Sequence, residues 1–290
     1  MPVDLHVHTN ASDGQYPPAE VVARAQREGL SAIAITDHDT TAGIAAAQHA
    51  AAVSFPPYEQ PQIIPGIELS AEDTIFDPVK GRETSIDVHV LGYFIQIDAP
   101  GFQDALYRFR DDRLTRAQAI LVKLAALGMP LVWERVLEIA QGGAVGRPHI
   151  ARALLEAGFV ESVPDAFDRY LRAGGSAYVA RARLSPEGAV ALIHQAGGAA
   201  VLAHPGYVPH YPRLIERLIP SQLDGVEIWH PGNNEHVRAN LKALASRYNL
   251  VETGGSDYHG EAVKPDIRMG SVTAPQGAVA ALKERAAQFR

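Results

Sequence analysis

The 290-residue sequence contains no cysteine. Disulfides, thiolate zinc sites, iron–sulfur clusters and a cysteine nucleophile are therefore excluded. Any metal ion that the protein binds must take nitrogen and oxygen ligands, for which His, Asp and Glu side chains are the natural sources.

The chain also lacks an excess of positive charge and a long apolar run. Lys and Arg number 26 against 33 Asp and Glu, a formal net charge of −7, so we do not expect long nucleic acid as a partner. No apolar stretch approaches the length that crosses a bilayer, and no basic, apolar leader opens the sequence. We therefore expect a cytoplasmic globular protein without a membrane partner. The length allows an α/β barrel of about 250 residues that carries an insertion.

Short apolar runs alternate with helical patterns over most of the chain, which predicts βα units and a mainly parallel sheet. Strands are expected at residues 3–8, 32–36, 63–69, 86–93, 199–203, 225–229 and 250–253. Helices are expected between them at residues 17–28, 41–52, 185–196 and 234–248. The acidic residues Glu72 and Asp73 fall beyond the third strand and are assigned to a solvated loop.

Residues 101–183 differ from the rest of the chain. They hold twelve Arg and Lys against nine Asp and Glu, whereas the remainder holds fourteen against twenty-four. Helical spacing recurs at 103–127, 133–140, 148–157 and 164–171, with Trp133 and Phe167 at positions typical of a helical core. We therefore predict a barrel made from residues 1–100 and 184–290, interrupted by a helical insertion domain at 101–183.

Almost every apolar strand run ends in residues that bind metals through nitrogen or oxygen. Because the carboxyl ends of parallel barrel strands meet on one face, these residues are expected to surround one site. His6 and His8 lie two apart on a strand, so both side chains point to the same face. The candidate ligands are His6, His8, Asp13, His38, Glu68, His89, His204, Asp257 and His259.

Four motifs in this order resemble those of the PHP (polymerase and histidinol phosphatase) family of metal-dependent phosphoesterases. The motifs are His6-Val7-His8-Thr9, Thr36-Asp37-His38, Ala203-His204-Pro205 and Ser256-Asp257-Tyr258-His259, with Glu68 and His89 between them. The resemblance covers residues 1 to about 100 and about 185 to 272. It implies an α/β fold, a distorted seven-stranded (β/α) barrel, with the helical insertion as a substrate-binding domain.

The resemblance also implies three divalent cations, with manganese as the first expectation and iron or zinc as alternatives. The implied ligand sets are His6, His8, Glu68 and Asp257 for the first ion, Glu68, His89 and His204 for the second, and Asp13, His38 and His259 for the third. Such ions suit phosphate ester hydrolysis because they polarise the phosphoryl group and activate water. Glu68, Asp257 and His38 are therefore expected to serve catalysis. Asp37 and His230 are candidates for protonating the leaving oxygen.

The insertion contains a candidate anion site. Gly146-Arg147-Pro148-His149 opens a helix, and the free N–H groups of its first turn lie between the side chains of Arg147 and His149. Arg116 and Arg135, with His230 from the barrel, are expected to extend the substrate site. The helical insertion with its stretch Gly143-Ala144-Val145-Gly146-Arg147-Pro148-His149-Ile150-Ala151 resembles a PHP branch that includes 3′,5′-nucleoside bisphosphate phosphatases and short-RNA 5′→3′ exoribonucleases. The resemblance implies removal of the 3′-phosphate from molecules such as adenosine 3′,5′-bisphosphate, giving AMP, while the insertion holds the 5′-phosphate.

Other interpretations stay open at this point. Histidinol phosphatase activity would leave Arg147 and His149 without a second phosphate to hold. An amidohydrolase shares the H-x-H start but commonly adds a bridging carbamylated lysine, and only Lys80 precedes residue 101. A metal-binding regulatory module without activity would be expected to lack ligands. Tyr178 and Trp229 are candidates for stacking on a nucleobase, although packing roles are favoured for both.

Overall fold

The computed structural model describes residues 2–290 except 57–58, 78–80, 141, 144 and 180–183, so Lys80 lies outside the described residues. Seven strands form one sheet in chain order. They are β1 (Val3–Val7), β2 (Ala32–Ile35), β3 (Gln62–Asp77), β4 (Arg82–Tyr93), β5 (Ala199–Leu202), β6 (Gly225–Trp229) and β7 (Val251–Gly254). Every predicted strand is present, and the α/β class is confirmed.

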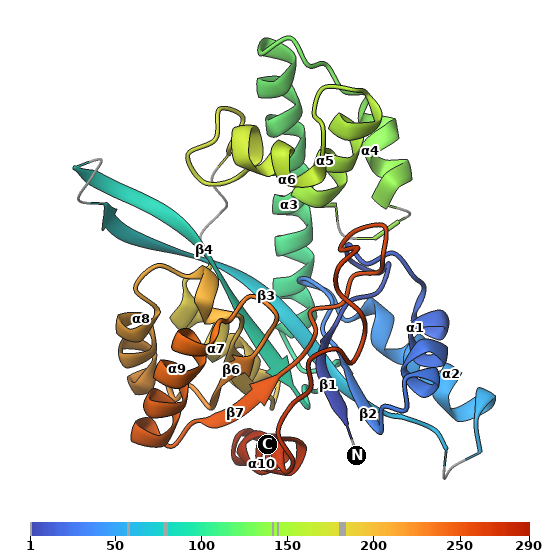
Figure 1. Cartoon of the computed structure of the whole chain (residues 1–290), viewed down its shortest axis with the longest axis vertical. Coiled ribbons are helices and arrows are strands. Elements are labelled where there is room, and N and C mark those ends of the chain that lie inside the picture. Colours follow the sequence, from blue (N-terminus) through green and yellow to red (C-terminus); the bar gives the residue numbers. More distant parts are fainter. Residues whose placement is uncertain (1, 57–58, 78–80, 141, 144, 180–183) are drawn as a thin grey trace.

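The sheet curls into a nearly closed barrel of mixed direction (Figure 1). Strands β1 to β3 are parallel, as are β5 to β7, but β4 runs antiparallel to both β3 and β5. A bridge between Val7 and Tyr258 joins the two edges. The expectation that all strands meet at their carboxyl ends is therefore wrong for β4. His89 reaches the site from within that strand, opposite Ser70 of β3.

Strands β3 and β4 extend beyond their predicted bounds and form a hairpin that projects from the barrel (Figure 1). Glu72 and Asp73 belong to β3, so their assignment to a loop is wrong. The backbone N–H of Glu72 donates to the carbonyl of Leu184 at 2.9 Å. The Asp73 carboxylate pairs with Arg217 at 2.8 Å. These tertiary partners stabilise a charged strand outside the barrel.

The side chains on the inner face of the barrel differ between its two ends. Ile64, Leu91 and Val201 belong to one buried apolar cluster, which α10 (Ala278–Ala286) closes at one end. Glu68 and His89 share a strand face with Ile64 and Leu91, respectively, because side chains alternate along a strand. The barrel is therefore apolar toward α10 and carries ligand residues toward the opposite end.

Helices cover the outer face of the sheet, where a second apolar cluster is buried. These helices are α1 (Pro18–Arg27), α2 (Ala42–Ser54), α7 (Pro186–Gln195), α8 (Tyr211–Leu218) and α9 (Glu235–Tyr248). Short 3₁₀ turns occur at η2 (Pro205–Tyr207), η3 (Ile219–Ser221) and η4 (Ala287–Phe289). The helices that the sequence predicts for this part of the chain are present, with ends that lie within two residues of the predicted ones.

The insertion is helical and stands over the open end of the barrel (Figure 1). It contains α3 (Phe102–Ala126), α4 (Trp133–Ala140), α5 (Arg147–Glu156), α6 (Val163–Ala166) and the π-helical turn η1 (Phe167–Leu171). Leu124, Val136 and Ile150 belong to its own buried core. Phe102, at the start of α3, is instead buried in the barrel core. A domain boundary at residue 101 stays a prediction.

Candidate metal centre

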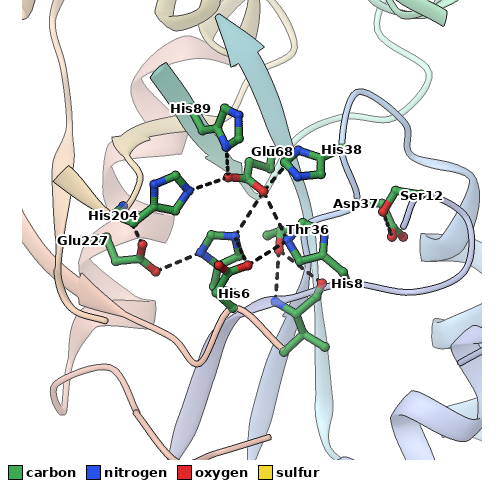
Figure 2. Close-up of polar contacts among 12 residues, drawn as sticks. His6, His8, Ser12, Thr36, Asp37, His38, Glu68, His89, His204 and Glu227 are labelled. Carbon is green, nitrogen blue, oxygen red and sulfur yellow. Dashed lines mark hydrogen bonds and ion pairs between the residues drawn. The ribbon is translucent and has the colours of Figure 1, made fainter. Parts of the chain in front are cut away.

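Glu68 lies at the centre of the predicted ligand cluster (Figure 2). Its Oε2 atom lies 3.2 Å from His6 Nε2, 3.1 Å from His8 Nε2 and 3.3 Å from His38 Nδ1. Its Oε1 atom lies 2.7 Å from His89 Nδ1 and 2.9 Å from His204 Nε2. One buried carboxylate therefore contacts imidazoles from four different parts of the barrel.

Two further carboxylates complete the cluster. Asp13 lies 3.6 Å from His8, 3.8 Å from His38 and 3.3 Å from His259. Asp257 Oδ1 lies 3.5 Å from His6, 3.4 Å from His8 and 3.4 Å from His259. The structure thus brings together the nine residues that the sequence predicts as ligands.

The donor atoms gather into three groups among the described residues. Within each group the atoms lie within 4.8 Å of one another, and the groups are His8, Asp13, His38 and His259; His6, His8 and Glu68; and His38, Glu68 and His89. The grouping differs from the predicted one because His8 joins the Asp13 group and His38 joins the His89 group. Asp257 and His204 belong to none of the three groups, although Asp257 contacts His6 and His8, and His204 contacts Glu68.

The protonation states of the carboxylates and of three imidazoles suit metal binding. Burial raises the pKa of each carboxyl, but neighbouring cationic groups outweigh burial and hold the pKa values of Asp13, Glu68 and Asp257 well below their ordinary values. Burial lowers the pKa values of His38, His204 and His259, which favours neutral imidazole. Burial acts in the same direction on His6 and His8, but neighbouring carboxylates outweigh it and raise the pKa of His6 well above its ordinary value and that of His8 to about 9. These two rings therefore release a proton when a cation binds. Charged carboxylates and neutral imidazoles are the forms that coordinate a cation.

Unpartnered nitrogen atoms support the same interpretation. Both ring nitrogens of His8, Nδ1 of His38 and Nδ1 of His204 are buried and make no hydrogen bond among the described residues. The His8 and His38 atoms lie 3.1 to 3.6 Å from carboxylate oxygens of Glu68 and Asp13, so they approach a carboxylate without sharing a proton with it. Buried polar atoms without partners are costly and call for an explanation. A divalent cation bound by nitrogen and oxygen atoms fits both these atoms and the carboxylates beside them.

Two ligand residues have backbone conformations that side chains rarely adopt. His204 has φ +28° and Asp257 has φ +55°. The backbone N–H of His204 donates to Glu227 at 2.7 Å, and the Lys264 ammonium donates to Asp257 Oδ2. Glu227 also lies 3.0 Å from His6 Nδ1 and fixes that ring. Strained residues persist where their surroundings hold them, and Glu227 and Lys264 supply that support.

Asp37 stabilises the loop that follows β1. Its carboxylate accepts hydrogen bonds from the Thr9 backbone at 2.8 Å, the Thr9 hydroxyl at 2.7 Å and the Ser12 hydroxyl at 2.6 Å. A Cβ atom on Gly43 would come within 2.5 Å of this carboxylate, so only glycine fits there. Asp37 therefore holds the loop after β1, and the structure gives its oxygens partners other than the leaving oxygen.

A cavity of about 330 Å³ lies between the ligand cluster and the insertion. The barrel side presents ligands and Lys264, while the insertion side presents Arg113, Arg116 and Arg147. Arg113 pairs with Asp39 and donates to the Ser70 hydroxyl at 2.9 Å. The insertion therefore faces the ligand cluster with guanidinium groups.

The predicted substrate residues divide into two sets. Arg116 and Arg147 line the cavity, and Arg147 makes two hydrogen bonds of 3.1 Å to the carboxylate of Asp87. His230 is buried 3.4 Å from Asp257 and is not among the residues that line the cavity.

His149 and Arg135 have other surroundings. The Nδ1 atom of His149 accepts a hydrogen bond from the Gly146 N–H at 3.0 Å and caps α5, and burial lowers its pKa to about 4. A neutral capping ring cannot supply the positive charge expected of it. Arg135 is half-exposed and pairs with Glu138 and Glu156.

Sequence patterns did not single out Glu227, Lys264 or Arg113. Glu227 lies inside β6 between two buried apolar residues. A charged residue between two apolar residues of a strand is the sequence feature from which Glu227 could have been singled out. Arg113 lies three residues before Arg116 on α3, and this spacing places both on one side of the helix.

Comparison with known proteins decides the family. The PHP domain model matches residues 4–179. The chain belongs to the PHP family. Membership confirms the resemblance seen in the four motifs and makes the chain a hydrolase of phosphoric ester bonds. Among the described helices, none is long and apolar enough to cross a bilayer.

Curated relatives and a solved structure agree with this assignment. The 5′-3′ exoribonuclease Rnm of Salmonella typhimurium is 35% identical over 88% of this chain and 84% of its own length. A 3′,5′-nucleoside bisphosphate phosphatase of Chromobacterium violaceum is 33% identical over 89% of this chain and 87% of its own. A solved candidate metal-dependent phosphoesterase of Bifidobacterium adolescentis superposes with a TM-score of 0.83, at 30% identity and 98% coverage of both chains.

Proposed function

We propose that this PHP protein removes the 3′-phosphate from nucleoside 3′,5′-bisphosphates such as adenosine 3′,5′-bisphosphate. Water attacks the 3′-phosphorus, the bond to the ribose oxygen breaks, and inorganic phosphate and 5′-AMP leave. The observation that carries the proposal is the cavity with carboxylates and imidazoles on one side and guanidinium groups on the other. Similarity to a bisphosphate phosphatase supports the same substrate class.

The centre is proposed to hold three divalent cations, manganese first, and Glu68 would be a ligand of two of them. Divalent ions in such a centre neutralise phosphate charge and lower the pKa of water. Three further residues hold the candidate ligands in position. Glu227 orients the ring of His6, Lys264 holds Asp257, and Asp37 holds the loop that carries Asp13.

The second phosphate of the substrate is proposed to bind the arginines of the insertion. Arg113, Arg116 and Arg147 line the cavity, against the carboxylates of Asp39 and Asp87 that pair with two of them. A guanidinium group has five N–H donors, so a carboxylate partner can orient it and leave donors for a phosphate. Binding remote from the reacting phosphorus then provides specificity for a doubly phosphorylated substrate.

Short oligoribonucleotides cleaved from the 5′ end are the second candidate substrate. The 35% identity to the exoribonuclease Rnm favours this activity. The 5′-phosphate of an oligoribonucleotide offers the same second charge as that of a bisphosphate. The net charge of −7 disfavours long nucleic acid, which basic surfaces bind.

The first experiment measures products released by the manganese-loaded protein from five substrates. These are adenosine 3′,5′-bisphosphate, 3′-AMP, 5′-AMP, histidinol phosphate and a 5′-phosphorylated trinucleotide. We expect the bisphosphate to have the highest kcat/KM, with 5′-AMP as product. Preference for histidinol phosphate would replace the proposal with that activity. Full metal content without turnover of any ester would indicate a regulatory module.

Arg147→Ala tests the second phosphate site. We expect KM for the bisphosphate to rise about tenfold to a hundredfold, because a charge-assisted contact remote from the chemistry is lost. Hydrolysis of p-nitrophenyl phosphate, which has no second phosphate, should change much less. Arg135→Ala is the matched control, since Arg135 lies outside the cavity and pairs with Glu138 and Glu156. Equal losses on both substrates would contradict the two-phosphate model.

A further inference from the structure

The cavity has an apolar wall that neither the metal centre nor the arginines explain. The insertion lines it with Ala117, Ile120, Val145, Ile150, Val163 and Phe167. Ile120 and Ile150 are fully buried in the insertion core, whereas Val163 and Phe167 are only partly buried at the edge of that core. The core of the insertion is therefore open to the cavity where Phe167 lies.

One face of helix α3 contributes several residues to the lining of the cavity. Arg113, Ala117 and Ile120 recur at i, i+4 and i+7, so they share one face of the helix. Seven residues correspond to a rise of about 10 Å along the axis. Helix α3 runs from Phe102 in the barrel core to Leu124 in the insertion core, away from the barrel (Figure 1), so along this face Arg113 comes before Ile120 on the way from the barrel to the insertion core.

Phe167 is fixed at the edge of this wall. The Ser162 hydroxyl caps α6 by accepting from the Asp165 N–H at 3.2 Å, and Phe167 then begins the π-helical turn η1. Val163 and Phe167 are four residues apart and lie on the same helical side. The guanidinium carbon of Arg147 lies 5.8 Å from the centre of the Phe167 ring. An aromatic ring thus lies beside the arginine proposed for the second phosphate.

We propose that Phe167 is the stacking platform for the base of a nucleotide substrate, with Val163, Ile120 and Ile150 beneath it. The inference rests on the proposed function, because it places the base next to the phosphate that the arginines bind. Apolar side chains carry no hydrogen-bond donors or acceptors, so the subsite does not distinguish one base from another. It favours a substrate that has a flat base over one that has no base. Phe167 is therefore more than the core residue that its helical spacing predicts.

The test compares adenosine 3′,5′-bisphosphate with the same sugar bisphosphate that lacks a base. Stacking of one base on one aromatic ring corresponds to about a tenfold effect or more, so the wild type should favour the nucleoside by at least that ratio in kcat/KM. Phe167→Leu keeps an apolar side chain but removes the ring, and should lower the ratio about tenfold through KM. Phe159→Leu is the matched control, because Phe159 packs on the same core and lies outside the cavity lining.

A binding measurement provides a readout that does not depend on turnover. Phe167→Trp places a fluorophore at the platform, and in the presence of a chelator its emission should be quenched by AMP more strongly than by ribose 5-phosphate. A wild-type ratio near one, an equal effect of Phe159→Leu, or equal quenching by the two ligands would overturn the inference. If neither bisphosphate is hydrolysed while another ester is, the proposed function fails. The quenching measurement then still tests whether a base stacks on residue 167.

Discussion

Glu68 is the residue on which the contacts of the site converge. Its two oxygens contact five imidazoles and its side chain is 1% exposed, so its negative charge is compensated only by groups of the site. Its pKa is held well below the ordinary value because the neighbouring histidines outweigh burial. An amide of the same shape would keep the packing but lose the charge that a shared metal ligand needs.

Glu68→Gln should therefore lower metal content and turnover together. We expect at least one equivalent of metal to be lost and phosphate release to fall about a thousandfold or more, measured by elemental analysis and by product assay on the same preparation. Glu72→Gln is the matched control, since Glu72 is a buried carboxylate on the same strand outside the cavity lining. Full metal occupancy in Glu68→Gln would remove Glu68 from the centre.

Single residues also show where prediction from sequence ends. His6, His204 and Asp257 could be predicted because each lies at an apolar strand end in a motif that the family shares. Glu227 and Lys264 could not, because their importance lies in partners distant in sequence or in the strain at φ +55° of Asp257. They contact candidate ligands, and only the folded chain shows which of these they contact.

In helix α5, a residue of a predicted anion-binding motif has a different role in the structure. The first turn of α5 was expected to bind an anion with both Arg147 and His149. The structure keeps Arg147 in the cavity, while His149 caps the helix by accepting from Gly146. A histidine at the third helical position can use its ring nitrogen as a Glu or Gln does in a capping box. Residue type and spacing alone do not separate these roles.

The cap predicts a pH dependence of stability. The pKa of His149 is about 4 in the folded protein, and a free imidazole titrates near 6.5, so the unfolded chain takes up the proton first as the pH falls. Its contribution is fully present above about pH 6.5 and is lost toward pH 4. By pH 5 the loss is about 2 kcal/mol.

His149→Gln should remove that part of the pH dependence while keeping a capping side chain. Urea unfolding of both proteins at pH 7.5 and pH 5, with a chelator present, gives the difference directly. We expect the wild type to lose about 2 kcal/mol more than the variant between these pH values. Equal losses in the two proteins would show that His149 is not neutral in the fold.

The hairpin of β3 and β4 is the element that sequence patterns described least well. Predicted strands at 63–69 and 86–93 match the parts inside the barrel, where apolar residues alternate. The outer parts carry charged residues such as Glu72 and Asp73, which disfavour a strand on propensity alone. Asp73 is stabilised there by Arg217 of α8, a contact between residues 144 positions apart in sequence. Tertiary contacts of this kind leave no local pattern.

At the scale of the whole molecule, the barrel and the insertion each have an apolar core, and the cavity lies between them. Apolar packing holds the barrel together toward α10, whereas its other end is held by contacts among buried ionisable groups. Three carboxylates and several imidazoles converge there from β1, β3, β4 and the loops beyond β1, β2, β5 and β7. Bound cations would join segments from both halves of the sequence that otherwise meet at this end only through polar contacts.

Removal of metal should therefore lower the stability of the whole barrel. A ligand that binds only the folded state at a concentration one hundred times its Kd stabilises it by about 2.7 kcal/mol, which for a chain of this size raises Tm by roughly 5 °C. We expect manganese to raise the Tm of chelator-treated protein by at least that amount in calorimetry. Glu68→Gln should respond much less, because the shared ligand is gone. An unchanged Tm in the wild type would show that the cluster is held together by its own hydrogen bonds and ion pairs, and that the cations do not contribute to the stability of the barrel.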